Sequence, residues 1–370
     1  MAKKGTIRFI NKDRSQFFNT LKVNVDEYFT KNHISKNGNA TMVIKTIVLL
    51  SAYIVPYLIM LLFPQPLYMM ILLYSLMGLG MAGIGMSIMH DANHNAYSSN
   101  QTINKLLGYT LNLAGGNVFN WKLQHNVLHH TYTNIHEMDD DIDSKLVLRL
   151  SPHGEVKKIH RFQFIYAFLF YAITTLYWAL LKDFVQYYKY TRNGVNRANS
   201  SEKAKQFSIL IISKLFYFFY LFFVPVVFFN LHFAHVLIGF LIMHAISGVI
   251  LTTIFQLAHT VEGTTHPLPN DKNEVENEWA IHQMNTTVNF ARHNRIISWY
   301  VGGLNFQVEH HLFPNICHVH YYKISEIVKK TAEEFGVPYL DNETFADAFN
   351  SHIRLLKKLG ESPSSMKVAA

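Results

Sequence analysis

The sequence has little charge and almost no cysteine. Of its 370 residues 16% are charged and 49% are hydrophobic, whereas about a quarter of the residues in a typical soluble protein are charged. This shortage of charge predicts that part of the chain lies in lipid. The single cysteine, Cys317, excludes an internal disulfide and a zinc site built from several thiolates. We expect it to be a small, buried apolar residue.

The chain also lacks the pattern of a nucleic-acid-binding protein. Its formal net charge of +8 would suit a nucleic acid or an anionic membrane surface. However, no arm rich in lysine and arginine is interleaved with aromatic residues, and long apolar runs argue against a nucleic-acid partner. The polar residues 1–41 contain no apolar segment with a cleavage site, so we expect no secretory signal.

Four apolar runs predict membrane-spanning helices arranged as two hairpins. The runs cover residues 46–63, 67–89, 207–229 and 236–258. At 1.5 Å per residue, the second and fourth reach about 35 Å, enough to cross the hydrocarbon core. The connector within each hairpin lacks lysine and arginine but the flanks carry them, which places the chain outside the hairpins in the cytosol. Lys214, the charged residue of the third run, is expected to snorkel to the cytosolic interface.

A fifth run, residues 162–181, is uncharged as well. A crossing here would put the histidines before and after it on opposite faces of the membrane. The run is rich in tyrosine, threonine and tryptophan, a composition typical of the interface, so we predict a helix lying in the interface.

These features predict an all-α integral membrane protein. We expect four transmembrane helices in two hairpins, an interfacial helix and a cytosolic, histidine-rich helical cap. Residues 1–41 would form a polar cytosolic N-terminal segment, residues 42–340 the membrane domain, and residues 341–370 a C-terminal helix and flexible tail.

The 21 histidines are the most unusual feature of the composition. His90 and His94 follow the second run with a spacing of four, which places both on one face of a helix. His125, His129 and His130 come about 30 residues later. In an α-helix His125 and His129 would share a face, and His130 would be rotated about 100° from His129.

Three more histidines lie nearer the C-terminus. His310 and His311 follow Gln307 in Gln-Val-Glu-His-His, and His259 ends the fourth run. Together with the five above they make eight imidazoles, more than the four ligands of a structural zinc or the three of a catalytic one. Two metals with about five ligands each would use them all. A metal site at the edge of lipid suggests chemistry on an aliphatic substrate.

The three motifs, His-x₃-His, His-x₃-His-His and Gln-x₂-His-His, resemble the histidine boxes of the membrane fatty acid desaturases in order and spacing. The phrases NWKLQHNVLHHTYTN (residues 120–134) and GGLNFQVEHHLFP (residues 302–314) are similar to the acyl-lipid/acyl-CoA branch. The resemblance covers roughly residues 40–340.

The resemblance implies a non-haem di-iron centre. By analogy one iron would be held by five of the histidines and the other by three. The first set is His90, His94, His125, His130 and His310; the second set is His129, His259 and His311. Gln307 would lie nearby or bind through water. No further catalytic residue and no other cofactor is implied.

The resemblance also implies the reaction: O₂-dependent insertion of a cis double bond into a fatty acyl chain linked to coenzyme A or a lipid. Gln307 stands where many desaturases have the first histidine of the third box, and this substitution resembles the front-end, linoleoyl-CoA-desaturase-like subgroup. Many of those enzymes carry a fused cytochrome b5 domain marked by His-Pro-Gly-Gly, but here His266-Pro267 is followed by Leu-Pro. We therefore expect a separate electron donor, ferredoxin or cytochrome b5-like. The site would lie on the cytosolic face of a bacterial plasma membrane or of the endoplasmic reticulum.

Several residues keep two interpretations. Asp91 could fix the tautomer of a ligand histidine or be a polar residue at a span end, and His282 could support the site or be structural. The acidic residues 139–143 form a solvated turn or partner the box histidines. Arg161, Arg292 and Arg295 would meet an anionic headgroup or coenzyme A, or follow the positive-inside rule.

Two other functions compete with desaturation. A histidine-box membrane hydroxylase of acyl or sphingoid chains would use the same residues. A histidine-rich metal transporter would place its ligands near the bilayer midplane, whereas these eight are expected at one membrane face. His244, which lies within the fourth run, is expected to be a hydrogen-bonded interhelical residue rather than a ligand.

Overall fold

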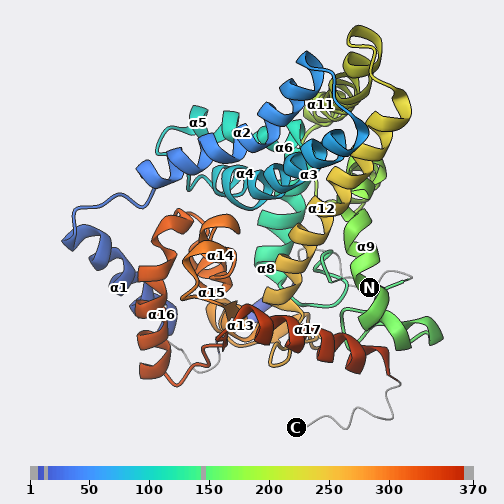
Figure 1. Ribbon diagram of the computed structural model, residues 1–370. Helices are drawn as coiled ribbons and strands as arrows, with labels where there is room; N and C mark the ends of the chain where they lie inside the picture. Colours follow the sequence, from blue (N-terminus) through green and yellow to red (C-terminus); the bar gives the residue numbers. More distant parts are fainter. Residues whose placement is uncertain (1–6, 12–15, 143–146, 362–370) are drawn as a thin grey trace. The chain divides into compact units, whose positions relative to one another are not determined.

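The computed structural model describes residues 7–11, 16–142 and 147–361, and most of these are helical (Figure 1). The chain divides into two compact units, each assembled from separated stretches. Unit 1 comprises residues 1–36, 124–167 and 254–370, and unit 2 comprises residues 37–123 and 168–253. The mainly helical fold that the sequence predicts is confirmed.

Unit 2 contains long apolar helices together with shorter, more polar ones. Its helices are α2 (Ala40–Leu62), α3 (Leu67–Gly83), η1 (Ile84–Ile88), α4 (Met89–Asn93), α5 (Gln101–Gly108), α6 (Thr110–Leu113), α7 (Val118–Trp121), η4 (Trp178–Lys182), α10 (Asp183–Arg192), α11 (Ser200–Phe218) and η5 (Phe219–Phe228). Three further helices contain residues of both units: η2 (Lys122–His129), α9 (Gln163–Tyr177) and α12 (Phe233–His259).

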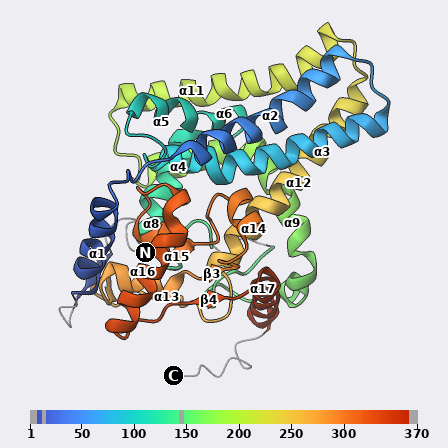
Figure 2. The ribbon, with the colours of Figure 1, turned by 60° about the vertical axis from the view of Figure 1, so that its left-hand side comes forward.

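Five continuous helical stretches in the described residues are long and apolar enough to cross a membrane. They are Ala40–Leu62, Leu67–Asn93, Lys158–Arg192, Ser200–Phe228 and Phe233–His259. Four of them contain or largely overlap the runs predicted to span, and α2 and α3 pack together as the first predicted hairpin requires (Figure 2). The third contains residues 162–181, and its placement in the interface stays a prediction.

Several of these long helices contain π-helical turns. η1, η4 and η5 are π-helices, and η5 contains Pro225. Proline cannot donate a backbone hydrogen bond and its ring clashes with the carbonyl four residues earlier, which a widened turn relieves. The helix therefore continues through Pro225 to Phe228.

The interior of unit 2 contains two polar clusters. Lys214 is 5% exposed, and its Nζ donates to Asp183 Oδ2 at 2.6 Å and to the carbonyl oxygen of Trp178 at 3.0 Å. The predicted snorkelling of Lys214 is therefore wrong, because a buried carboxylate on another helix supplies its counter-charge. His244 is hydrogen-bonded to Tyr217 and Thr175, which confirms the interhelical role predicted for it.

Unit 1 contains short helices and four short strands. Its elements are β1 (Arg8–Ile10), α1 (Phe17–Lys31), α8 (His130–Tyr132), η3 (Lys158–Phe162), β2 (Glu274–Glu276), α13 (Trp279–Thr286), β3 (Asn289–Phe290), α14 (Arg295–Tyr300), α15 (Gln307–Leu312), η6 (His318–His320), α16 (Tyr321–Glu334), β4 (Asp341–Asn342) and α17 (Phe345–Gly360). β1 pairs in parallel with β2, and β3 with β4.

The core of unit 1 joins the beginning of the chain to its last third. The apolar face of α1 (Phe17, Leu21, Val25 and Phe29) is buried against α13, α15 and α16 (Figure 2). Cys317 is fully buried, which confirms the prediction that it is a small, buried apolar residue. The N-terminal helix thus helps to hold α15, which carries the third histidine motif.

α17 is the helix predicted near the C-terminus. Thr344 caps it, because its Oγ1 accepts from the backbone N–H of Asp347 while the Asp347 carboxylate accepts from the backbone N–H of Thr344. Most of the predicted flexible tail, residues 362–370, lies outside the described residues, as does Asp143 of the acidic turn.

Candidate metal centre

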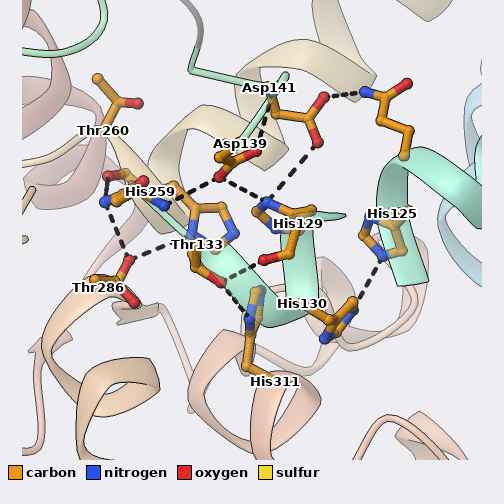
Figure 3. Close-up of polar contacts among 12 residues, drawn as sticks. His125, His129, His130, Thr133, Asp139, Asp141, His259, Thr260, Thr286 and His311 are labelled. Atoms are coloured by element: carbon orange, nitrogen blue, oxygen red, sulfur yellow. Dashed lines mark hydrogen bonds and ion pairs between the residues drawn. The ribbon is translucent and has the colours of Figure 1, made fainter. Parts of the chain in front are cut away.

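Three histidines from separate parts of the sequence come together in unit 1. His129 ends η2, His259 ends α12 and His311 lies in α15. All three are fully buried, and a ring nitrogen of each lies within 4.8 Å of one from each of the other two. We call these residues the His129 group (Figure 3). They are the set that the sequence resemblance assigned to the second iron.

Each histidine of the His129 group has a partner for Nδ1. His129 Nδ1 lies 3.0 Å from Asp139 Oδ2, His311 Nδ1 lies 2.8 Å from Gln283 Oε1, and His259 Nδ1 lies 3.3 Å from the carbonyl oxygen of Thr286. These acceptors hold the proton on Nδ1 and leave the lone pair on Nε2. The three Nε2 atoms are buried and make no hydrogen bond within the described part of the chain. A metal ion would supply their missing partner.

Asp139 is the charged partner in this arrangement. Burial alone would raise the pKa of its carboxyl group, but the contacts with His129 and with the backbone N–H groups of Asn134 and Asp141 lower it below the ordinary value. The carboxylate is therefore ionised and orients His129. Asp141 is farther away, its Oδ2 lying 3.8 Å from His129 Nδ1. The acidic turn thus partners a box histidine, one of the two interpretations left by the sequence.

Two polar side chains connect the elements that carry the His129 group. Thr133 Oγ1 donates to Gln283 Oε1 at 2.8 Å. It also lies 3.3 Å from His311 Nδ1, as Figure 3 shows. Asn134 Nδ2 donates to the carbonyl oxygen of His259 at 3.0 Å. The segment that follows α8 is therefore joined directly to both α15 and α12.

A second set of histidines, the His130 group, lies beside the first in unit 1. We define it as His125, His130 and His310, whose ring centroids lie 4.6 to 5.8 Å from one another. The Nε2 atoms of His125 and His130 are 3.2 Å apart. Two nitrogens bound at right angles to one metal, at about 2.1 Å each, would be about 3 Å apart. His130 also stacks on His311 with ring centroids 4.4 Å apart, so the two groups adjoin.

The α-helical geometry predicted for the second motif is wrong. Residues Lys122–His129 form a π-helix, whose hydrogen bonds join residues five apart instead of four. An α-helix would turn residues five apart away from each other. The wider turn brings His125 and His130 together, and it also leaves the rings of His125 and His129 stacked at 5.3 Å.

His90 and His94 belong to unit 2, where both are buried at the end of the α3–α4 helical stretch. Their ring centroids are 4.9 Å apart, and Trp121 packs edgewise against both. This confirms that the first motif presents both side chains together. Asp91 Oδ1 lies 3.8 Å from His90 Nδ1, longer than a hydrogen bond. That Asp91 fixes the tautomer of a histidine in this motif stays a prediction.

Gln307 and His282 were also predicted near the centre, and the structure places them differently relative to the histidine groups. Gln307 is 2% exposed and lies next to His259. His282 is also buried, but its ring packs against Phe9 with centroids 5.0 Å apart, and it belongs to neither histidine group. Its neighbour Gln283 makes the contact with His311 instead.

Sequence reasoning missed several hydrogen-bond partners of the clustered histidines, including Gln283, Thr133, Asn134 and the carbonyl of Thr286. Glu309 was missed as well. Its carboxylate is fully buried and accepts from Asn289 Nδ2 at 2.8 Å and from Tyr339 OH at 3.0 Å. Burial raises the pKa of Glu309 to about 7. The sequence offered one indication for two of these residues: Gln283 directly follows His282, and Glu309 directly precedes His310.

Arg292 can also be assigned. Its guanidinium group pairs with Asp341 at 2.7 Å and lies over the Tyr339 ring. The interaction attaches β4 to the segment that follows β3. Arg292 is thus engaged within unit 1, and neither interpretation left by the sequence, a bound headgroup or a membrane-flanking charge, describes this contact.

Comparison with known proteins agrees with this chemistry. The model of the fatty acid desaturase family matches residues 39–342. An sn-1 linoleoyl-lipid 6-desaturase of Synechocystis sp. is 36% identical over 94% of this chain and 96% of its own length. An enzyme of the same description from Arthrospira platensis is 35% identical over 95% of both chains. An acyl-lipid (8-3)-desaturase of Physcomitrium patens is 33% identical over 97% of this chain and 74% of its own length.

Proposed function

Because the chain belongs to the fatty acid desaturase family, we propose that it inserts a cis double bond into the acyl chain of a membrane lipid at a di-iron centre. Membership establishes a membrane fatty acid desaturase, an oxidoreductase that requires a fatty acyl substrate, O₂ and an electron donor. The predicted class of enzyme is thereby confirmed, and the metal transporter is set aside.

The observation that supports the metal centre is the bonding of the His129 group. Three fully buried imidazoles have acceptors at Nδ1 and leave Nε2 without a protein partner. Burying such a nitrogen without a partner is unfavourable, and neutral imidazole is a good ligand for iron. The donor set therefore fits a metal ion bound by these nitrogens.

We assign eight histidines to two irons as the family resemblance implies. His129, His259 and His311 would hold one, and His125, His130 and His310 would help to hold the other. His90 and His94 are added to the second set on the strength of the sequence motif. Gln307, which lies next to His259, would remain near the irons or bind one of them through water. When bound, the irons would supply O₂ activation and removal of two hydrogens from the acyl chain.

The remaining tasks fall to the chain's own residues. Asp139 keeps the proton of His129 on Nδ1, and Gln283 does the same for His311. The exposed fraction of every histidine in the two groups is at most 8%. Such burial excludes bulk water from the reacting atoms and so prevents side reactions.

The relatives support a proposal on the finer specificity. Two of them are named as acting on the 6-position of linoleoyl lipids and another as an acyl-lipid (8-3)-desaturase. We propose front-end regiochemistry and a lipid-linked substrate for this chain, with acyl-CoA as the alternative. The donor would be ferredoxin or a cytochrome b5-like protein, and the active site would face the cytosol.

The membrane arrangement is part of the proposal. Four helices would cross as two hairpins, and α9 would lie in the interface. A cysteine introduced at Gly194, after α10, and one at Gly154, before η3, test this, because Cys317 is buried and would give little background. Labelling of both from the same side of the membrane supports an interfacial α9; labelling from opposite sides contradicts it.

The reaction is tested by expressing the chain in a host without polyunsaturated lipids and feeding defined fatty acids. Desaturation lowers the product mass by about 2 units, whereas hydroxylation raises it by about 16. We expect a new double bond on the carboxyl side of an existing one, found first in intact lipid. A hydroxylated product would contradict the proposed reaction, and a bond on the methyl side would contradict only the regiochemistry.

A further inference from the structure

One face of unit 1 combines exposed positive charge with exposed apolar side chains. It is formed by η3 and by the last turns of α17, and we call it the η3–α17 surface. Its exposed basic residues are Lys158, Arg161, Lys357 and Lys358, and its exposed apolar residues are Ile159 and Phe162. The guanidinium group of Arg161 lies over the Phe162 ring.

α17 is held directly against η3 and the start of α9. Arg149 Nη1 donates to the carbonyl oxygen of Leu359 at 2.6 Å, and Gln163 Nε2 donates to that of Leu356 at 2.8 Å. Gly360 lies so close to His160 that an added Cβ would meet the His160 carbonyl oxygen at 2.2 Å. These contacts fix the last turns of α17 beside η3 (Figure 2).

The same helix is bonded to the segment that follows α12. His352 Nδ1 donates to the carbonyl oxygen of Thr260 at 2.6 Å, and the backbone N–H of Glu262 donates to Ser351 Oγ at 2.9 Å. Arg354 pairs with Glu262 at 2.6 Å. Thr260 directly follows His259, the last residue of α12. α17 therefore contacts the ends of two long apolar helical stretches.

These two ends define the depth of α17 relative to a membrane. The apolar run of α12 stops at His259, and the uncharged run of α9 starts at Phe162. Such boundaries lie where hydrocarbon gives way to lipid headgroups. This is true of Phe162 whether α9 crosses the membrane or lies along its surface. A helix bonded to both boundaries is at headgroup level.

The charge of the surface is not neutralised within the protein. Among the described residues no ion pair joins Lys158, Arg161, Lys357 or Lys358 to a carboxylate. The exposed Asp347 caps the opposite end of α17, and Glu361, which directly follows the helix, is the acidic residue nearest to the two lysines in sequence. Clustered cations beside apolar side chains at headgroup depth fit an anionic lipid surface.

We propose that the η3–α17 surface binds the anionic headgroups of membrane lipids, with Ile159 and Phe162 inserted at the acyl boundary. α17 lies beyond the residues matched by the family model. Through His352 and Thr260 the contact would also brace the helix end that carries His259. The proposal does not rest on desaturation, and its failure would leave the proposed function intact.

The test compares the full chain in two kinds of nanodisc, phosphatidylcholine alone and phosphatidylcholine with about one third phosphatidylglycerol. Hydrogen–deuterium exchange is followed over α17. We expect exchange to be about tenfold slower in the anionic nanodiscs, and about 0.5 M salt to remove the difference. A Lys357→Glu/Lys358→Glu variant should lose the difference, and Lys357→Gln/Lys358→Gln should reduce it.

The matched control is Lys329→Glu/Lys330→Glu, which reverses another exposed pair of adjacent lysines on α16. It should behave as the unaltered chain. Equal exchange of α17 in both nanodiscs would overturn the proposal. So would a control variant that loses this difference as the Lys357→Glu/Lys358→Glu variant does. Slowing only when an acidic redox protein is added would overturn it too, in favour of a donor-docking surface. The glutamine variant keeps the test valid if charge reversal unfolds the helix.

Discussion

The His129 group in unit 1 and His244 in unit 2 are all buried histidines, but their nitrogens are bonded differently. His244 Nε2 lies 2.8 Å from Tyr217 OH, and its Nδ1 lies 3.1 Å from Thr175 Oγ1. In the His129 group only the Nδ1 atoms have protein partners. A histidine with both nitrogens bonded is complete as a structural residue, whereas the His129 group combines three Nε2 atoms that make no protein hydrogen bond with ring nitrogens lying within 4.8 Å of one another, an arrangement that could hold a metal ion.

Removing a metal ligand should have the largest effect. His129→Ala is expected to reduce the unsaturated product below detection and to lower the iron content, while the protein remains in the membrane. The reason is that loss of a ligand should exceed the ten- to hundredfold cost typical of losing a ligand's partner. Lipid unsaturation and iron per chain are the measurements. Unchanged unsaturation would contradict the proposed centre.

His244→Phe is the control for that experiment. It leaves Tyr217 OH without its acceptor and should cost about 1–3 kcal/mol of unfolding free energy. Iron per folded chain should stay at the level of the unaltered protein. If this variant loses iron as His129→Ala does, the distinction between the two kinds of buried histidine fails.

The buried ion pair of unit 2 gives the next largest effect. Lys214→Met leaves the carboxylate of Asp183 buried without its counter-charge, which should destabilise the protein by about 3–5 kcal/mol. Lys205→Met, on the same helix, breaks an exposed pair with Glu202 and should cost less than about 1 kcal/mol. Unfolding in detergent, followed by circular dichroism, separates the two. Equal costs would show that Lys214 is effectively solvated.

His352 predicts a pH effect. Burial lowers its pKa to about 4, from an unfolded value of 6.5. The unfolded chain therefore binds the proton more readily, so this residue's contribution to stability is complete above pH 6.5 and is lost as the pH falls towards 4. The shift corresponds to about 3 kcal/mol at most.

The measurement is the unfolding free energy at pH 7 and at pH 4.5. His352→Gln should lose less stability between these values than the unaltered chain does. The exposed His293 provides the control, since His293→Gln should keep the original acid dependence. An identical pH dependence in all three proteins would show that His352 titrates normally.

The smallest effect concerns the charged partner of the His129 group. Asp139→Asn keeps an acceptor for His129 Nδ1 but removes the negative charge, so iron affinity should fall about ten- to hundredfold. Iron bound per chain is measured against graded free iron, independently of turnover. Asp141→Asn should matter less, because Asp141 is 3.8 Å away. A larger loss with Asp141→Asn would reverse the assigned roles.

The sequence was sufficient to predict the histidine motifs and the apolar runs. Both are local patterns: spacings of four place His90 and His94 together, and charge-free runs identify helices such as α3 and α12. His259 could be predicted from a local pattern as well, because it ends an apolar run. The six histidines of the His129 and His130 groups are then brought together by the folding of segments that lie far apart in the sequence.

What the sequence could not predict depends on tertiary contacts. Gln283 and His282 are neighbours on α13, and only the packing of α13 against α15 decides which of them reaches His311. The counter-charge of Lys214 lies 31 residues away, at Asp183. The π-helix of the second motif has no distinctive composition, so an α-helical rotation was the natural but incorrect expectation.

The discontinuity of unit 1 has a consequence for synthesis of the chain. α1 is translated before every candidate span, yet its packing partners α13, α15 and α16 come after all of them. During translation the apolar face of α1 therefore lacks its final packing partners while the membrane helices are inserted. His310 and His311 are made late too. A metal ion bound as proposed would therefore load only after α15 has been made, and a chain that stops short of α15 would lack two of the proposed ligands.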